Sequence, residues 1–313
     1  METQKLMPLG NTGLSVPRLG IGAWAWGDRL VWGFGRGYTD ADIRGAFQTS
    51  IQAGVNFFDT AEVYGSGRSE RFLGAFAKDS PSPVFIATKF FPFPWRLSKK
   101  DLLRALEGSI KRLGLEQVDL YQIHSPVSPL SIETWMEALG EAVHQGLTRA
   151  VGVSNFNRDQ MRRANDVLAK TGVPLASNQV EYSLVDRKVE RDGLLELCHE
   201  LGITLIAYSP IAKGLLTGKY SPENPLPGVR SLRYPKSFLI KVQPLLRLMQ
   251  EIGQEHEGKS ISQVALNWVI CKEALPIPGA KTAAQATENI GAIGWRLTDA
   301  EVTALDEASQ RLG

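Results

Sequence analysis

The chain has 313 residues, of which 43% are hydrophobic and 22% charged, and its 35 basic and 33 acidic residues leave a net charge of +2. This amount of apolar material is typical of a globular protein with a large core. The near-neutral balance argues against nucleic acid or a membrane surface as the main partner, because both require a strong basic excess. Length alone allows two average domains or one large α/β barrel.

The cysteines and the apolar stretches bear on cellular location. Cys198 and Cys271 lie in apolar, helix-like surroundings, which favours buried free thiols in a reducing compartment. Residues 1–5 lack the apolar region of a signal peptide, and no apolar run reaches the roughly 18 residues of a membrane span. We therefore expect a cytoplasmic protein without a membrane partner.

Short β-rich runs alternate with amphipathic helical segments along the chain. Residues 7–9 and 14–16, on either side of a Gly-Asn-Thr-Gly turn, predict an N-terminal β-hairpin. Strands are then expected at 19–23, 57–59, 84–88, 119–123, 150–153, 177–180, 204–208 and 275–278, followed in turn by helices at 42–53, 69–77, 101–113, 132–144, 158–170, 193–201, about 238–270 and 283–292. Thr298 and Glu301 have the spacing of a capping box and predict a last helix. The segment 220–235 is long for a bare connection and is expected to cover a ligand.

The alternation predicts the fold class. The expected strands are short apolar runs, which is typical of parallel strands buried on both faces. Eight strand–helix units imply parallel pairing with right-handed crossovers. Because no change in composition indicates a linker, we expect a single domain over residues 1–313: an α/β fold, specifically a (β/α)8 TIM barrel with an N-terminal β-hairpin and an extra C-terminal helix.

Four side chains of matched chemistry fall near the ends of consecutive strands. Asp59, Lys89 and His124 each close an apolar run, and Tyr64 follows Asp59 by five residues. A nearby ammonium lowers the pKa of a phenol from about 10, a carboxylate keeps that ammonium charged, and a histidine can donate a hydrogen bond to a substrate oxygen. Each residue alone has an ordinary structural explanation. Together they predict carbonyl reduction, with a tyrosine as the proton donor.

The segments that carry these residues resemble the aldo-keto reductases, including bacterial, plastid-type and potassium-channel β-subunit-like members. The likeness spans nearly the whole chain and is carried by Phe58–Gly65, Gly67–Glu70, Ile86–Lys89, Asp119–His124 and Gly152–Phe156. That family folds as a (β/α)8 barrel and reduces aldehydes and ketones with NADPH. The resemblance implies that Tyr64 is the proton donor, that Lys89 and Asp59 are its tuning pair, and that His124 orients the carbonyl.

The resemblance also implies an NADP(H) site. No Gly-x-Gly-x-x-Gly pattern follows a strand, so a Rossmann site is not indicated. From their chemistry alone, Asn155 and Gln179 suit a carboxamide and Tyr208 suits a nicotinamide face. Without the resemblance, the preferred explanations are a helix cap for Asn155, strand-end hydrogen bonding for Gln179 and core packing for Tyr208. The residues implied to bind the cofactor are Ser154, Asn155, Gln179, Tyr208, Ser209, Pro210, Ile211, Lys213, Gly214, Gly279, Lys281, Gln285, Glu288 and Asn289. By resemblance, Lys281 and Thr282 would hold the 2′-phosphate, and Gln285, Glu288 and Asn289 would contact the adenine. Gln285 stands where many relatives have an arginine, so the expected preference for NADPH rests mainly on Lys281.

Aromatic residues gather in two segments expected at the catalytic end. The candidates for the substrate pocket are Trp24, Trp26, Trp32, Phe34 and Trp95. As a group they predict an apolar pocket for aromatic or bulky carbonyl compounds, and a hydrophobic seal beneath long loops is the alternative. The arginines of these segments, Arg29, Arg36 and Arg96, are either ligands for an anionic group or simply solvated.

Two other functions are compatible with the same pattern. The first is an NADP(H)-binding regulatory or redox-sensing protein with little turnover, since channel β-subunits resemble this chain and retain the four residues. The second is an unrelated barrel enzyme such as a sugar-phosphate isomerase, and the four tetrad residues give that function no support. The histidines (His124, His144, His199 and His256) are scattered without ligand spacing, so no metal is expected. The expected partner is a small carbonyl substrate, and the sequence indicates no oligomeric state.

Overall fold

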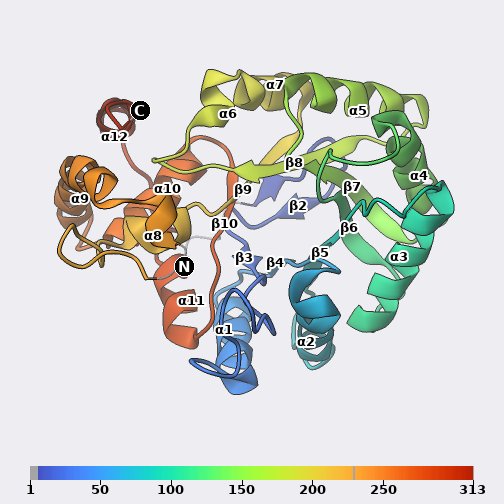
Figure 1. Ribbon diagram of the computed structural model, residues 1–313, viewed down its shortest axis with the longest axis horizontal. Coiled ribbons are helices and arrows are strands. Elements are labelled where there is room, and N and C mark those ends of the chain that lie inside the picture. Colours follow the sequence, from blue (N-terminus) through green and yellow to red (C-terminus); the bar gives the residue numbers. More distant parts are fainter. Residues whose placement is uncertain (1–5, 228–229, 313) are drawn as a thin grey trace.

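The computed structural model describes residues 6–227 and 230–312 of the protein. In this part of the chain, eight parallel strands follow one another in sequence order from β3 to β10 and curl into a barrel surrounded by helices (Figure 1). The barrel strands are β3 (Ile21–Gly22), β4 (Phe57–Asp59), β5 (Phe85–Phe90), β6 (Val118–Ile123), β7 (Thr148–Ser154), β8 (Leu175–Glu181), β9 (Thr204–Tyr208) and β10 (Leu275–Ile277). Gly22 bridges Gly279 in parallel and its amide donates to the carbonyl of Pro278 at 3.0 Å, so the first and last strands meet. The predicted barrel is confirmed.

Helices follow the strands in the expected alternation. Their bounds are α1 (Asp40–Gln52), α2 (Arg68–Lys78), α3 (Lys99–Leu113), α4 (Ile132–His144), α5 (Arg158–Lys170), α6 (Lys188–Arg191), α7 (Leu194–Leu201), α8 (Arg230–Arg233), α9 (Lys236–Glu255), α10 (Ile261–Cys271), α11 (Ala283–Ile290) and α12 (Asp299–Gln310), with the 3₁₀ segments η1 (Tyr64–Gly67) and η2 (Ala212–Thr217). The final helix, α12, begins at the predicted Thr298–Glu301 capping box. The segment 1–5, where a signal peptide was not expected, lies outside the described residues. In the described ranges no helix is long and apolar enough to span a membrane.

The N-terminal hairpin closes one end of the barrel. β1 (Met7–Pro8) pairs antiparallel with β2 (Ser15–Val16), as predicted. One buried cluster contains Met7, Leu9 and Val16 together with side chains that the barrel strands direct into the barrel. Gly10 has a φ of +56°, and a Cβ there would lie 2.6 Å from the carbonyl oxygen of Ala176, so only glycine fits this close turn. With the N-terminal end filled, the C-terminal ends of the strands form the open face.

The helical region expected at about 238–270 is two helices. α9 ends at Glu255, and α10 begins after Ser260, whose hydroxyl accepts a hydrogen bond from the amide of Gln263. Between them Glu257 and Gly258 both have positive φ, which an α-helix does not accommodate. The expectation of one continuous helix was wrong. The helical spacing of apolar residues continues across the break, and the turn that separates the two helices is only a few residues long.

The segment 220–235 is folded against the end of β8. Within it α8 forms, residues 228–229 lie outside the described part, and Leu226 and Tyr234 are buried. The guanidinium of Arg233 lies 2.9 Å from Glu181 and 3.2 Å from Asp186. These ion pairs hold the segment beside the open face of the barrel.

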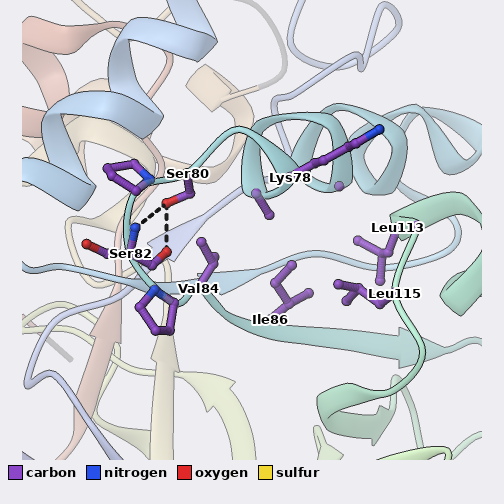
Figure 2. Close-up of a pocket in the computed structure, with 12 residues that line it drawn as sticks. Lys78, Ser80, Ser82, Val84, Ile86, Leu113 and Leu115 are labelled. Atoms are coloured by element: carbon purple, nitrogen blue, oxygen red, sulfur yellow. Dashed lines mark hydrogen bonds between the residues drawn. The ribbon is translucent and has the colours of Figure 1, made fainter.

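A hollow of about 420 Å³ lies between the C-terminal ends of α2 and α3. Figure 2 shows Ser80 and Ser82 hydrogen-bonded to each other on one side and Leu113 and Leu115 on the other. The ammonium of Lys78 points away from the two serines (Figure 2). Lys78 is the one titratable side chain among the residues that line this hollow, so it does not have the converging ionisable groups of an active site.

Candidate active site

The C-terminal ends of β4, β5 and β6 bring the predicted tetrad together. Asp59 is the last residue of β4, Lys89 lies in β5 opposite Gln122 of β6, and His124 directly follows β6. Tyr64 opens η1, and the next residue, Gly65, has a φ of +55°. A Cβ at Gly65 would lie 2.8 Å from the carbonyl oxygen of Gly27, so glycine is required for the sharp turn that aims Tyr64 back at the barrel.

The ammonium of Lys89 is completely buried and has three partners. It donates to Asp59 Oδ1, to the carbonyl of Thr60 at 2.9 Å, and to the Tyr64 hydroxyl at 3.5 Å. Three acceptors match the three donors of an ammonium. The lysine is therefore fixed between the carboxylate and the phenol, as its expected role requires.

Burial and charge set the protonation states of this pair. Burial lowers the pKa of Lys89, but the charges and hydrogen bonds of Asp59 and Tyr64 together outweigh burial and leave that pKa above its ordinary value. For Tyr64, burial has the opposite effect and raises the pKa of the phenol. The nearby Lys89 charge offsets only part of this rise, so the pKa of Tyr64 stays above its ordinary value of 10. This differs from the expectation of a net lowering, because desolvation outweighs the ammonium. Tyr64 is thus a protonated phenol at neutral pH with a cation ready to stabilise its conjugate base.

His124 is neutral at physiological pH. Burial, and then the Lys89 charge, lower its pKa to about 3. Its Nδ1 atom is buried without a hydrogen-bond partner, while the residue lines the cleft. A proton on Nδ1 would leave a buried donor unsatisfied, so the tautomer with the proton on Nε2 is favoured. That tautomer presents a donor to a ligand oxygen, and the ring packs edge-on against Tyr64 with 5.7 Å between centres.

The tetrad lies in an open cleft of about 810 Å³, which is in the size range of ligand sites. Asp59, Tyr64 and His124 line it, and Lys89 lies behind them. Of the residues that the sequence assigned to cofactor binding, all but Thr282 also line this cleft: Ser154, Asn155, Gln179, Tyr208, Ser209, Pro210, Ile211, Lys213, Gly214, Gly279, Lys281, Gln285, Glu288 and Asn289. Residues at the ends of seven barrel strands, β3, β4 and β6 to β10, thus converge on one space.

Amide and phenol groups connect the tetrad to the centre of the cleft. Asn155, in the left-handed region with a φ of +63°, donates to the carbonyl of His124 at 3.2 Å and accepts from the Tyr208 hydroxyl at 3.0 Å. Ser154 donates to the carbonyl of Gln179 at 2.8 Å. Burial raises the pKa of Tyr208 to about 12, so its hydroxyl stays a donor. These bonds fix the side chains expected to meet a nicotinamide.

The far part of the cleft has features that suit phosphate. Ser209, Ala212, Lys213 and Gly214 all have positive φ, a backbone conformation that turns successive N–H groups toward one side. On the opposite side the Lys281 amide donates to Gln285 Oε1 at 2.8 Å at the start of α11. The ammonium of Lys281 lies 4.7 Å from the ring centres of both Trp32 and Tyr38.

The residues expected beside an adenine ring are already hydrogen-bonded within the protein. Glu288 accepts from the Ser260 hydroxyl, and Asn289 donates to the carbonyl of Gly279 at 3.2 Å. These contacts hold α11 against α10 and the end of β10.

The aromatic candidates divide into two groups. Trp24 and Trp32 line the cleft, and Trp24 stacks on Tyr64 with 5.9 Å between ring centres and 27° between planes. Trp26 is fully buried in the core, where its indole donates to the carbonyl of Ala280 at 2.8 Å. The prediction that Trp26 lines the substrate pocket was therefore wrong. Trp26 instead forms part of the hydrophobic seal beneath a loop, which was the alternative explanation.

Phe34 and Trp95 also lie away from the cleft. Phe34 packs on Tyr38 and Phe72, and Trp95 is 70% exposed and stacks on Phe93 at the surface. Composition could not separate these residues from Trp24 and Trp32, because apolar side chains in long loops serve packing and ligand binding alike.

Sequence reasoning missed Gln122. Its side chain is buried and donates to Asp59 Oδ2 at 3.2 Å, beside the Gln179 donor at 2.8 Å to the same oxygen. The signal was available, because residues two apart on a strand face the same side and Gln122 precedes His124 by two. The cleft is also lined by Glu181, Lys219 and Tyr220, which the sequence did not single out. Within residues 6–227 and 230–312, no three His, Cys, Asp or Glu side chains cluster as a metal site would require.

The sequence matches the model of the Aldo/keto reductase family over residues 18–310. The chain belongs to this family. It is therefore an oxidoreductase that acts on carbonyl compounds, in agreement with the tetrad at its open face.

The chain is similar to a pyridoxal reductase, an aldo-keto reductase and a glycerol dehydrogenase. It is 41% identical over 310 residues to the chloroplastic pyridoxal reductase of Arabidopsis thaliana, covering 95% of this chain and 84% of that protein. It is 32% identical over 273 residues to the aldo-keto reductase yakc [NADP(+)] of Schizosaccharomyces pombe, covering 82% and 78%. The structure of glycerol dehydrogenase from Gluconobacter oxydans superposes with a TM-score of 0.85 at 27% identity, covering 99% of this chain and 96% of that one.

Proposed function

We propose that this aldo-keto reductase uses NADPH to reduce aldehydes and ketones to alcohols, with Tyr64 as the proton donor. The observation that carries the proposal is the position of the Tyr64 hydroxyl. It lies 3.5 Å from a buried ammonium that Asp59 keeps charged, and its ring adjoins a neutral histidine. These groups face a cleft whose other end has the backbone geometry and the lysines that suit phosphate.

The residues of the cleft fit a nicotinamide dinucleotide. Asn155 and Gln179 would hold the carboxamide, with the Tyr208 ring beside the nicotinamide, and the left-handed backbone of 209–214 would bind the pyrophosphate. Lys281 would pair with the 2′-phosphate, and Glu288 with Asn289 would meet the adenine. When bound, NADPH supplies the hydride that the carbonyl carbon receives.

The chain's own residues handle the oxygen of the substrate. His124 donates Nε2–H to the carbonyl oxygen and fixes its position, since the imidazole is neutral and its other nitrogen is buried. Tyr64 transfers its phenolic proton to that oxygen. The negative charge left on the phenolate is stabilised by Lys89, which Asp59 holds in place and keeps protonated.

Flat aromatic aldehydes are the substrates that this cleft favours. Trp24 and Trp32 form an apolar wall beside Tyr64, with Trp24 edge-on to Trp32 at 5.4 Å. The similarity to a pyridoxal reductase makes pyridoxal the first compound to test.

Both cysteines are free thiols, which supports a reducing compartment such as the cytoplasm. We also propose that residues 1–313 act as one domain.

The test is NADPH oxidation by the purified protein with a panel of aldehydes and ketones that includes pyridoxal, and with NADH in parallel. Turnover with NADPH that exceeds turnover with NADH supports the proposal. Tight NADPH binding without turnover across the panel would favour a regulatory or redox-sensing protein instead.

A further inference from the structure

An ion pair between two loops lies directly beside the catalytic tetrad. Glu62 is in the loop that connects Asp59 to Tyr64, and Arg96 is in the loop that follows β5. The guanidinium binds the carboxylate with both terminal nitrogens, Nη1 to Oε1 at 2.5 Å and Nη2 to Oε2 at 2.9 Å. The side chains of Glu62 and Arg96 are only 9% and 18% exposed, so water screens the pair weakly.

Further bonds attach the pair to the backbone at Phe91. The amide of Phe91 donates to Glu62 Oε1 at 2.7 Å, and its carbonyl accepts from Arg96 Nη1 at 2.8 Å. The guanidinium also lies 4.5 Å from the ring centre of Phe90 and 5.3 Å from that of Phe93. Only a planar, forked cation can make the bidentate pair and the ring contacts together. Arg96 is therefore fully engaged within the protein, which removes it as a candidate for binding an anionic substrate group.

Phe91 is the point at which this pair reaches the chemistry. Its ring packs edge-on against His124, with 5.5 Å between centres and 74° between planes. The loop also has contacts of its own, because the amide of Phe93 donates to the carbonyl of Phe91 at 2.9 Å and the two rings lie 4.6 Å apart. The bonds that Glu62 and Arg96 make to the Phe91 backbone tie this locally packed turn to the loop of the proton donor and so help to hold the Phe91 ring beside His124.

We propose that the Glu62–Arg96 pair is a positioning and specificity-determining element of the substrate site. It ties the loop of the proton donor to the loop of Phe91 and so sets the width of the space beside His124. Phe91 lies against His124 and is not among the residues that line the cleft, so the pair acts through the position of the His124 ring. A flat aromatic aldehyde fills the space beside that ring, whereas a small aliphatic aldehyde contacts only the polar atoms of Tyr64 and His124. The inference rests on the proposed reductase function.

A double-mutant cycle tests it, with Glu62→Gln, Arg96→Met and the double variant assayed with NADPH on pyridoxal and on propanal. We expect each single variant to raise KM for pyridoxal about tenfold, and to change KM for propanal and kcat for both substrates by less than about threefold, because the tetrad is untouched. The double variant should resemble either single variant, since the pair acts as a unit. Arg96→Lys should recover only part of the loss, because an ammonium cannot bind in a fork.

The controls separate the possible failures. Glu133→Gln breaks the exposed ion pair with Arg163 and should leave both KM values unchanged. The double variant contains no unpaired buried charge, so it stays informative if a single variant folds poorly. Equal changes in KM for pyridoxal and propanal, or additive effects in the cycle, would overturn the inference while the reductase function stands. A wild-type protein that is inactive with NADPH would overturn the proposed function itself, and the inference with it.

Discussion

Gln179 donates its side-chain amide to the carboxylate of Asp59, with 2.8 Å between Nε2 and Oδ2. This bond joins the residue expected beside the nicotinamide to the residue that holds Lys89. Because Oδ1 of Asp59 accepts from Lys89 and Oδ2 from two glutamines, the carboxylate has a single well-defined orientation. Hydrogen bonds therefore connect the part of the cleft expected to bind the cofactor to the residues that support the proton donor.

Replacing Gln179 by Met should affect both sides at once. We expect the Kd for NADPH to rise and kcat to fall, each by about tenfold, because one charge-assisted hydrogen bond to Asp59 and the expected carboxamide contact are lost together. Fluorescence titration and steady-state kinetics measure the two effects. Gln145→Met, at the exposed end of α4, is the matched control. A fall in kcat with unchanged Kd would show that Gln179 serves only the tetrad.

The Lys89–Asp59 pair should dominate local stability. Lys89→Met leaves the Asp59 carboxylate buried without its counter-charge, which should lower the free energy of unfolding by about 3 kcal/mol. Adding Asp59→Asn removes that charge and should recover much of the loss, although activity stays absent in both variants. Urea unfolding of the two variants and the wild type provides the comparison. Equal stability of the single and double variants would contradict an uncompensated buried charge.

His124 should make stability depend on acid pH. Its pKa is about 3 in the folded protein and about 6.5 in an unfolded chain, so below about pH 6.5 the unfolded state binds a proton that the folded state does not. The free energy of unfolding should therefore fall as pH decreases, by about 2 kcal/mol between pH 7 and pH 5. In His124→Asn this part of the loss should disappear. Urea unfolding at the two pH values measures it, and identical pH dependence in both proteins would refute the assigned pKa.

Lys281 should determine the preference between the two cofactors. Lys281→Gln removes the ammonium expected at the 2′-phosphate, and the Kd for NADPH should rise about tenfold while that for NADH stays the same. Lys170→Gln, at the exposed end of α5, controls for a general loss of positive charge. If the variant binds NADPH as tightly as the wild type, the contact of Lys281 with Trp32 and Tyr38 is its main role.

Much of the fold followed from local pattern. Apolar runs of strand length alternated with helical periodicity, and the residues that close those runs had to meet at one face of a barrel. Asp59, Tyr64, Lys89 and His124 were found for this reason, and the cofactor residues followed from resemblance to the family. The break between α9 and α10 was missed, because two residues with positive φ leave no trace in the periodicity.

The remaining differences concern properties that depend on packing. Trp26 and Trp24 are two residues apart in similar sequence, yet one is buried beneath the loop and the other lines the cleft. The sequence left Arg96 either solvated or available to an anionic ligand, whereas in the structure it is paired with Glu62. The sequence could not show this pair, because Glu62 is distant along the chain and adjacent only in space. The pKa of Tyr64 depends on how much burial opposes the Lys89 charge, which residue types alone do not determine.

The central claim is that Tyr64 donates the proton, and Tyr64→Phe tests it most directly. We predict that NADPH-dependent turnover of the preferred aldehyde falls at least about 100-fold, with the Kd for NADPH unchanged, because the variant loses only the hydroxyl. A rate within a few-fold of the wild type would contradict the account and assign the proton to another group in the cleft.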